Sequence, residues 1–316
     1  MSLFYLNRAN STQLKGIAIL LVLLGHTHLI YKGSGGVALF LLLSGYGLTY
    51  SYNEKGRNSF WIKKVKKIYL PYLIIIVFQI VTYRIKDTKR ILISLLGLDF
   101  GLTVDGTMWF LSFLLFFYLC FYLAMIVNDM LKRKLKYDIV LFVILFLSIP
   151  LCVFLSERGI WRKGAGTYLY YYYFPIGVLL YYFSRIKVSS TTILITWTAT
   201  LFLTMSYCCS HINSINGKNE YFLYTFCQAM FWISLFQLSA GSHNYVLSFL
   251  GEYSFSIYLF EGFFMNIAYS WLDKISLQVI KHIIVIVISI VVGYCFQHYI
   301  LGFYQNGRGC QVQKTG

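Results

Sequence analysis

Residues 14–28 read LKGIAILLVLLGHTH, and this stretch decides the fold. Extended to about residue 31, the apolar run matches the roughly 20 residues that a helix needs to cross a bilayer. The polar residues before it, MSLFYLNRANSTQ, lack the apolar centre of a secretory signal, and no small-residue cleavage site follows the run. We therefore predict that the run stays in the protein as a membrane helix.

The rest of the chain repeats this pattern. Of its 316 residues 58% are hydrophobic and 12% are charged, and the mean hydropathy is +0.66, whereas an ordinary soluble domain carries about 25% charged residues. The sequence predicts an all-α integral membrane protein, a polytopic bundle of about ten transmembrane helices. The expected spans lie near residues 14–31, 35–52, 68–83, 107–127, 138–155, 168–183, 191–209, 221–240, 247–270 and 282–303.

One further apolar stretch is too short to be a span. Ile91–Val104 contains Asp99, so we expect a re-entrant or interfacial segment there. No loop is long enough for a soluble domain, so residues 1–316 are predicted to form one transmembrane domain. Its motifs occupy about residues 10–303, and a short cytoplasmic tail follows at 304–316.

Charge distribution predicts the orientation. With ten spans and both termini in the cytoplasm, most of the 27 basic residues lie on the cytoplasmic side, as the positive-inside rule requires. The formal net charge of +16 comes from residues in short loops between apolar spans. Anionic lipid headgroups explain such loops better than nucleic acid does. We expect a multi-pass protein of the cell membrane that contacts membrane lipid and binds no nucleic acid.

The first span carries two ionisable residues on one face. Lys15 and His26 are eleven positions apart, which corresponds to three helical turns plus about 20° and to about 16 Å along the axis. His26 lies deep in the span, where a neutral imidazole can act as a general base. The alternative is that Lys15 reaches the cytoplasmic headgroups and His26 is a packing residue. His28 faces another side, and we predict a structural role for it.

The ninth span carries the other unusual group, Glu261. Ser254, Tyr258 and Glu261 follow at i, i+4 and i+7 and form one polar stripe. Glu261 is about as deep in its span as His26 is in the first, and both helices are expected to run outward. We therefore predict a carboxylate–imidazole pair, either catalytic or purely structural.

Four lysines precede the third span in FWIKKVKKIYLPYL: Lys63, Lys64, Lys66 and Lys67. They are either a topology signal or a site for a phosphate-bearing ligand at the cytoplasmic mouth, which Lys15 would join.

Other patterns are assigned structural roles. Close helix packing is expected at Gly35, Gly36, Gly45 and Gly47, and the tyrosines of residues 168–174 suggest an interfacial aromatic belt. The seven cysteines contain no CxxC pair, so we predict no disulfide framework and no metal site.

Taken together, the motifs resemble the acyltransferase-three family of integral-membrane acyltransferases. The Lys15–His26 spacing matches the basic residue and histidine of its first helix, with lysine where arginine is usual. Glu261 stands where many members have histidine, and Phe40 and Ser44 are one residue further apart than the family pattern. The remaining resemblance lies in Gly36, Gly45, KKVKKIYLPYL, Trp109 with Tyr118, YYFPIGVLLYY and LGEYSFSIYLFEGFF.

The resemblance implies transfer of an acyl group, usually acetyl from cytoplasmic acetyl-CoA, to a hydroxyl of a glycan or its lipid-linked precursor. Acetyl-CoA is then a donor substrate, and no permanently bound cofactor is expected. In this interpretation His26 is the base and Glu261 its partner. Coenzyme A phosphates would be held by Lys15, Lys63, Lys64 and Lys67. The candidates for substrate binding or oxyanion stabilisation are Ser44, Trp109, Ser254 and Tyr258.

Three other classes stay open. In a transporter or flippase, Lys15, His26 and Glu261 would form a proton or substrate path, although no internal repeat is evident. A glycan polymerase usually needs a long external loop, which this chain lacks. A non-enzymatic membrane scaffold is the third class.

Overall fold

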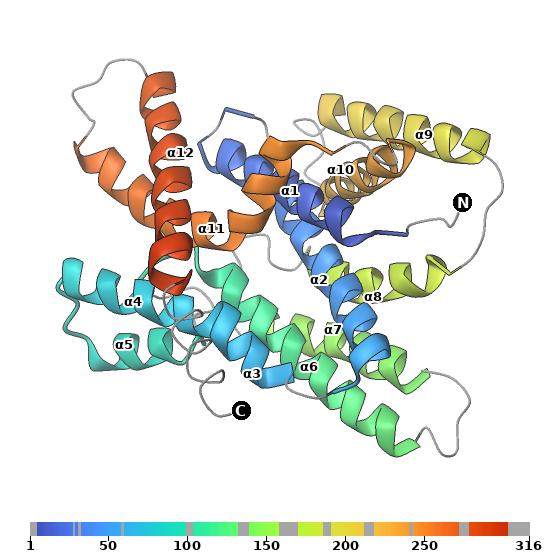
Figure 1. Ribbon diagram of the computed structural model, residues 1–316, viewed down its shortest axis with the longest axis horizontal. Helices are drawn as coiled ribbons and strands as arrows, with labels where there is room; N and C mark the ends of the chain where they lie inside the picture. Colours follow the sequence, from blue (N-terminus) through green and yellow to red (C-terminus); the bar gives the residue numbers. More distant parts are fainter. Residues whose placement is uncertain are drawn as a thin grey trace, which may run out of the picture.

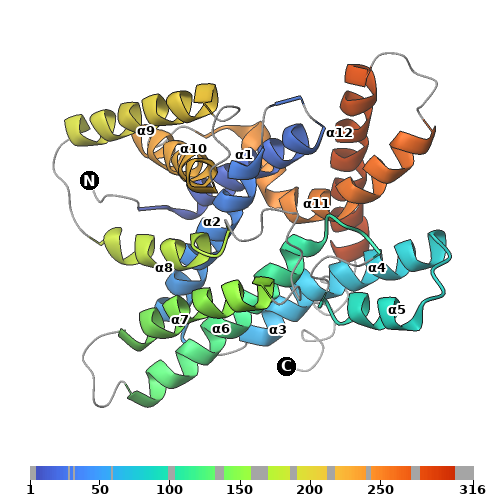
Figure 2. The ribbon, with the colours of Figure 1, turned by 180° about the vertical axis from the view of Figure 1, so that it is seen from behind.

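A computed structural model describes residues 5–27, 29–30, 33–57, 60–98, 104–131, 139–157, 170–185, 191–211, 218–239, 243–271 and 278–302. Within these ranges the regular elements are helices, and none is a strand, which confirms the all-α prediction. Figures 1 and 2 show the helices from opposite sides.

Each predicted span coincides with a helix. The first two are α1 (Arg8–His26) and α2 (Ser34–Lys55). The third is continuous from Phe60 to Thr82 and consists of α3 (Phe60–Lys64), the π-helical turn η1 (Val65–Tyr69) and α4 (Leu70–Thr82). The others are α6 (Trp109–Leu131), α7 (Ile139–Glu157), α8 (Tyr173–Phe183), α9 (Thr191–His211), α10 (Lys218–Leu238), α11 (Tyr245–Trp271) and α12 (Gln278–Cys295), which continues as the π-helical turn η4 (Phe296–Leu301).

Judged by length and apolar composition alone, only some of these helices could cross a membrane. Among the described residues four could do so: Phe60–Thr82, Trp109–Met130, Thr191–Ser210 and Val279–Ile300. These four fit a polytopic membrane protein, while the number ten stays a prediction. The other helices carry more polar residues, or only a shorter apolar segment of them is described.

Helix α1 lies at the centre of the site described below. It packs most extensively on α11 and also on α2, and Figure 1 shows α1 crossing α11. The crossing is close because glycines meet there. A methyl group on Gly16 would overlap the Leu247 carbonyl, and one on Gly251 would overlap the Thr12 carbonyl. The sequence thus allows two backbones to approach without side chains between them.

The short helix α5 (Thr88–Leu95) follows α4 and runs back along it (Figures 1 and 2). It begins at Asp87, whose carboxylate accepts hydrogen bonds from the first backbone amides of the helix. At its other end, the Tyr69 hydroxyl donates to the Leu95 carbonyl at 2.7 Å, and the Tyr72 hydroxyl donates to the Ser94 carbonyl. The chain therefore returns to the level of the first turn of α4. The re-entrant or interfacial segment expected at residues 91–104 stays a prediction, and Asp99 lies outside the described residues.

The predictions for the glycines of the second span are mostly confirmed. A methyl group added at Gly35, Gly36 or Gly45 would overlap atoms of a neighbouring helix. Gly47 has no neighbouring atom within 4 Å and is exposed, so the packing prediction for Gly47 was wrong. Gly47 lies on the outward face of α2, which the glycine pattern alone does not distinguish from the inward face.

The α1–α11 crossing gives a test of the fold. Gly251→Ala should lower the thermal unfolding temperature in detergent, because the new methyl group forces the backbones apart and overpacking costs about 1–3 kcal/mol. Gly47→Ala is the matched control and should leave the temperature unchanged or raise it, since alanine favours an exposed helix. Fluorescence-detected size-exclusion chromatography after heating measures both. Equal stability of Gly251→Ala and the parent protein would contradict the close crossing.

Candidate functional site

The last turn of α1 brings His26 against α11. The His26 Nδ1 atom lies 2.6 Å from the Glu261 Oε1 atom. The His26 side chain is 38% exposed, whereas the Glu261 side chain is 0% exposed. The prediction that these two groups meet is confirmed, and His26 and Glu261 are called the dyad below.

The dyad leaves one ring nitrogen for chemistry. An ionised carboxylate can only accept hydrogen bonds, so Nδ1 donates to Glu261 and Nε2 keeps its lone pair. His26 is also the final residue of α1, where the carbonyl ends of the helix favour positive charge. Both the carboxylate and the helix end therefore stabilise a protonated imidazole. A half-exposed ring with a free lone pair and these supports has the properties of a general base.

Glu261 is held in an apolar setting. Its second oxygen, Oε2, is buried and has no hydrogen-bond partner among the described residues. A buried polar atom without a partner costs free energy, and such atoms in a native structure commonly mark functional sites.

The two other members of the predicted stripe on α11 have different partners. The Tyr258 hydroxyl donates a hydrogen bond to the Thr107 carbonyl, and the Tyr258 ring packs edge-on against Phe110. The Ser254 hydroxyl donates to the Gly251 carbonyl in its own helix at 2.9 Å. Tyr258 thus fixes α11 beside the start of α6, whereas the described contacts do not connect Ser254 with the dyad.

Trp109, the first residue of α6, belongs to an aromatic group next to Tyr258. Its ring centre lies 5.5 Å from that of Tyr170 and 6.3 Å from that of Phe110. Since Phe110 in turn contacts Tyr258, Trp109 is linked to the dyad helix through one intervening ring. Its side chain is half-buried.

The predicted lysines gather in part around Lys15, near the middle of α1 and eleven residues before His26. The charges of Lys67 and Arg8 act on Lys15, and those of Lys15 and Lys67 act on Lys64. We call Lys15, Lys64 and Lys67 the basic cluster. None of the three forms an ion pair with a carboxylate in the part of the chain that the structure describes. Lys63 is exposed, and its described contacts do not place it in this cluster.

Ser44 lies with the basic cluster instead of the dyad. The Lys64 Nζ atom lies 4.6 Å from the centre of the Tyr118 ring, and the hydroxyl of this buried tyrosine pairs with the Ser44 side chain. Helix α2 meets the end of α1 where Gly33 packs on Gly25, and Ser44 is eleven residues further along, about 16 Å at helical rise. The structure therefore does not bring Ser44 to His26.

Sequence reasoning missed one buried acidic residue, Asp105. Its side chain is 1% exposed and its charge acts on His26. Asp105 accepts hydrogen bonds from Thr107 and from the side chain of Gln79. The available signal was an acidic residue just before the span at 107–127, in a chain with only 11 acidic residues.

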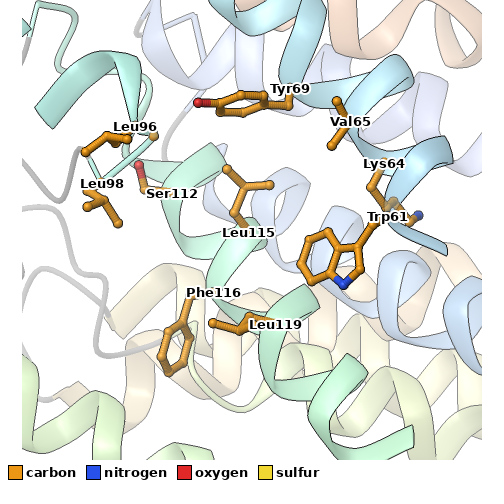
Figure 3. A pocket seen from close by; sticks show the side chains of 11 residues that line it. Trp61, Lys64, Val65, Tyr69, Leu96, Leu98, Ser112, Leu115, Phe116 and Leu119 are labelled. Atoms are coloured by element: carbon orange, nitrogen blue, oxygen red, sulfur yellow. The ribbon is translucent and has the colours of Figure 1, made fainter. Parts of the chain in front are cut away.

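An apolar cavity of about 340 Å³ lies elsewhere. It is bordered by α3, η1, α6 and the residues that follow α5. Figure 3 shows Trp61, Tyr69 and Leu115 around it. Of the candidate site residues only Lys64 lines it, and Figure 3 shows the ammonium group of Lys64 beyond the Trp61 ring. The cavity is therefore separate from the dyad.

His28, for which a structural role was predicted, lies outside the described residues.

In the described ranges, no three His, Cys, Asp or Glu side chains gather in a group that would hold an ion. The candidate residues form an imidazole–carboxylate dyad at the C-terminal end of α1 and a basic cluster around Lys15, near the middle of the same helix.

Comparison with known families agrees with this arrangement. A family model described as an acyltransferase domain, Acyl_transf_3, matches residues 9–298, which include the dyad and the basic cluster. No curated protein and no solved structure matches the chain. The match covers nearly the whole chain and agrees with the motifs read from the sequence. The chain therefore belongs to the Acyl_transf_3 family of membrane acyltransferases.

Proposed function

We propose that the protein transfers an acyl group, most simply acetyl from cytoplasmic acetyl-CoA, to a hydroxyl of a cell-surface or secreted glycan or of its lipid-linked precursor. Family membership supports acyl transfer, and the 2.6 Å contact between His26 Nδ1 and Glu261 Oε1 carries the assignment of the chemistry. A proton path in a transporter uses the same residue types, so the family match, and not the dyad, favours acyl transfer over transport.

In the proposed reaction, Nε2 of His26 removes the proton of the acceptor hydroxyl as its oxygen attacks the thioester carbonyl. The resulting tetrahedral intermediate collapses with cleavage of the carbon–sulfur bond. The proton on His26 then passes to the departing coenzyme A sulfur, so His26 is neutral again. Glu261 stabilises the positive imidazole during the cycle and fixes its tautomer, as the acidic member of a catalytic triad does.

The basic cluster would bind the coenzyme A phosphates. Three lysines without an acidic partner attract an anion, and lysine acts as a point-charge partner for phosphate. Coenzyme A carries its phosphates at one end and its thioester at the other. Lys15 and His26 are about 16 Å apart along α1, so a long donor can contact both residues. Lys63 would add to the positive potential from its exposed position.

The remaining candidates are assigned by their surroundings. Ser44 and Tyr118, next to Lys64, would contact the donor and not the oxyanion. Trp109 and Tyr258, near the dyad, would border the acceptor, whereas Ser254 is assigned no contact. With His26 toward the outer side, this arrangement fits a protein of the cell membrane with cytoplasmic termini. The donor would then enter from the cytoplasm and the acceptor from outside.

Removal of the base gives the first test. His26→Ala should lower acyl transfer at least about 100-fold, the usual contribution of a general base, while membrane insertion and yield stay normal. The measurement is transfer from radiolabelled acetyl-CoA by purified protein in detergent. His243→Ala is the control, since His243 is exposed and bonds only Ser248 in the described contacts. Full activity of His26→Ala would remove His26 from the mechanism.

Loss of the carboxylate charge gives the second test. Glu261→Gln keeps the shape of the side chain and should reduce kcat at least tenfold with little change in the donor KM, because the charge acts on the imidazole in the chemical step. Glu252→Gln changes an exposed acid of the same helix and should have no effect. Unchanged turnover in Glu261→Gln would show that the dyad is only structural.

The basic cluster gives the third test. Lys15→Ala should raise the donor KM about tenfold, since a lost charge-assisted contact costs about 1.5–3 kcal/mol. Lys15→Arg should preserve the KM because it keeps the positive charge. Steady-state kinetics with varied acetyl-CoA measures both variants, with Lys89→Ala, an exposed lysine of α5, as the control. A change confined to the acceptor KM would overturn the donor assignment.

A further inference from the structure

A second buried carboxylate lies in the short loop before α6. Both oxygens of Asp105 are engaged. Oδ1 accepts hydrogen bonds from the Thr107 backbone amide at 2.9 Å and from the Thr107 hydroxyl at 2.7 Å, and Oδ2 accepts one from Gln79 Nε2 at 2.8 Å. Gln79 is a fully buried residue of α4. Asp105 therefore connects Thr107 of its own loop to α4 through three hydrogen bonds.

The same loop contacts α11 at two residues, one before Glu261 in the sequence and one after it. Tyr258, three residues before Glu261, donates its hydroxyl hydrogen bond to the Thr107 carbonyl. At Gly262, the next residue after Glu261, a methyl group would overlap the Thr107 hydroxyl and lie 2.7 and 2.8 Å from the two Asp105 oxygens. The loop thus touches α11 at positions 258 and 262, and only a glycine at 262 permits this approach.

The loop also matters for the charge at the dyad. The negative charge of Asp105 acts on His26 in addition to that of Glu261. Neither carboxylate is exposed to solvent. The backbone of α11 between Tyr258 and Gly262 carries Glu261, so a displacement of the loop would move the Glu261 oxygen relative to His26 Nδ1.

We propose that Asp105 is a positioning residue of the dyad. Its hydrogen bonds to Thr107 and Gln79 hold the loop against Tyr258 and Gly262, and this contact keeps Glu261 within hydrogen-bonding distance of His26. The role in turnover rests on the proposed acyl transfer, whereas the role in geometry does not. Asp105 acts through Glu261 and needs no contact with substrate.

The position of Gln79 allows an experiment to separate the hydrogen bonds of Asp105 from its negative charge. Its Oε1 atom is buried without a hydrogen-bond partner in the described part of the chain. In Asp105→Asn, the side-chain carbonyl can accept from Thr107, and a turned Gln79 amide can offer Oε1 to the new NH₂ group. The loop is then held without a charge. Asp105→Ala removes both the charge and the hydrogen bonds.

The test compares these two variants by kinetics and by ¹⁵N NMR of histidine-labelled protein in detergent, with the His26 signals assigned by their loss in His26→Gln. Asp105→Ala should lower kcat at least 30-fold at unchanged donor KM and should shift the Nδ1 signal of His26. Asp105→Asn should restore kcat to within about threefold of the parent protein and should restore the signal. Asp129→Ala is the control, since Asp129 bonds Tyr52 and lies near Arg57, and it should change neither reading.

Other outcomes overturn the proposal. An unchanged His26 signal in Asp105→Ala excludes a positioning role, and an Asp105→Asn variant as impaired as Asp105→Ala shows that the charge matters and not the hydrogen bonds. If Asp105→Ala does not fold, Gly262→Ala carries the same test, because its methyl group displaces the loop and should shift the same signal. If the parent protein transfers no acyl group, the proposed function fails, while the NMR comparison still decides whether Asp105 positions the dyad.

Discussion

The hydrogen bond between His26 and Glu261 is the constraint on which the arrangement of this site depends. A carboxylate that is 0% exposed in a membrane protein is costly unless a cationic or hydrogen-bonding partner meets it. His26 is that partner, and it is available only because α1 and α11 approach each other closely. Gly16 and Gly251 allow this approach by leaving no side chain between the two backbones. The helix crossing and the chemistry therefore depend on the same two elements.

Opposite charges are separated along α1. Lys15, Lys64 and Lys67 lie near the middle of α1, and Glu261 and Asp105 lie near its C-terminal end. Lys15 and His26 are about 16 Å apart along the helix, too far for a direct ion pair between the two groups. Such a distribution favours an anionic group near the first and a positively charged imidazole near the second. A donor with phosphates and a distant reactive carbonyl suits both requirements.

Much of the fold could be predicted because helical geometry is regular. A fixed rise per residue places Lys15 and His26 on one face and gives His26 and Glu261 equal depth, so their contact could be predicted from two separate spans. Lateral relations between helices are different, since they depend on side-chain packing that one sequence does not specify. For this reason the prediction failed at Gly47, did not foresee that Ser44 lies beside Tyr118 and Lys64, and omitted Asp105. The π-helical turns η1 and η4 had no sequence signal that we could use.

The dyad is asymmetric, and this asymmetry connects structure with mechanism. Glu261 is fully enclosed and contacts the ring at Nδ1, while the ring itself remains 38% exposed. A base must be held rigidly on one side and reached by substrate on the other, because a fixed orientation is lost if solvent surrounds both partners. The position of His26 at the final residue of α1 meets both needs. A histidine in the middle of a helix that packs on two neighbours would be enclosed on all sides. At the helix end, the carbonyl groups and Glu261 stabilise the positive ring, while the ring itself stays partly exposed.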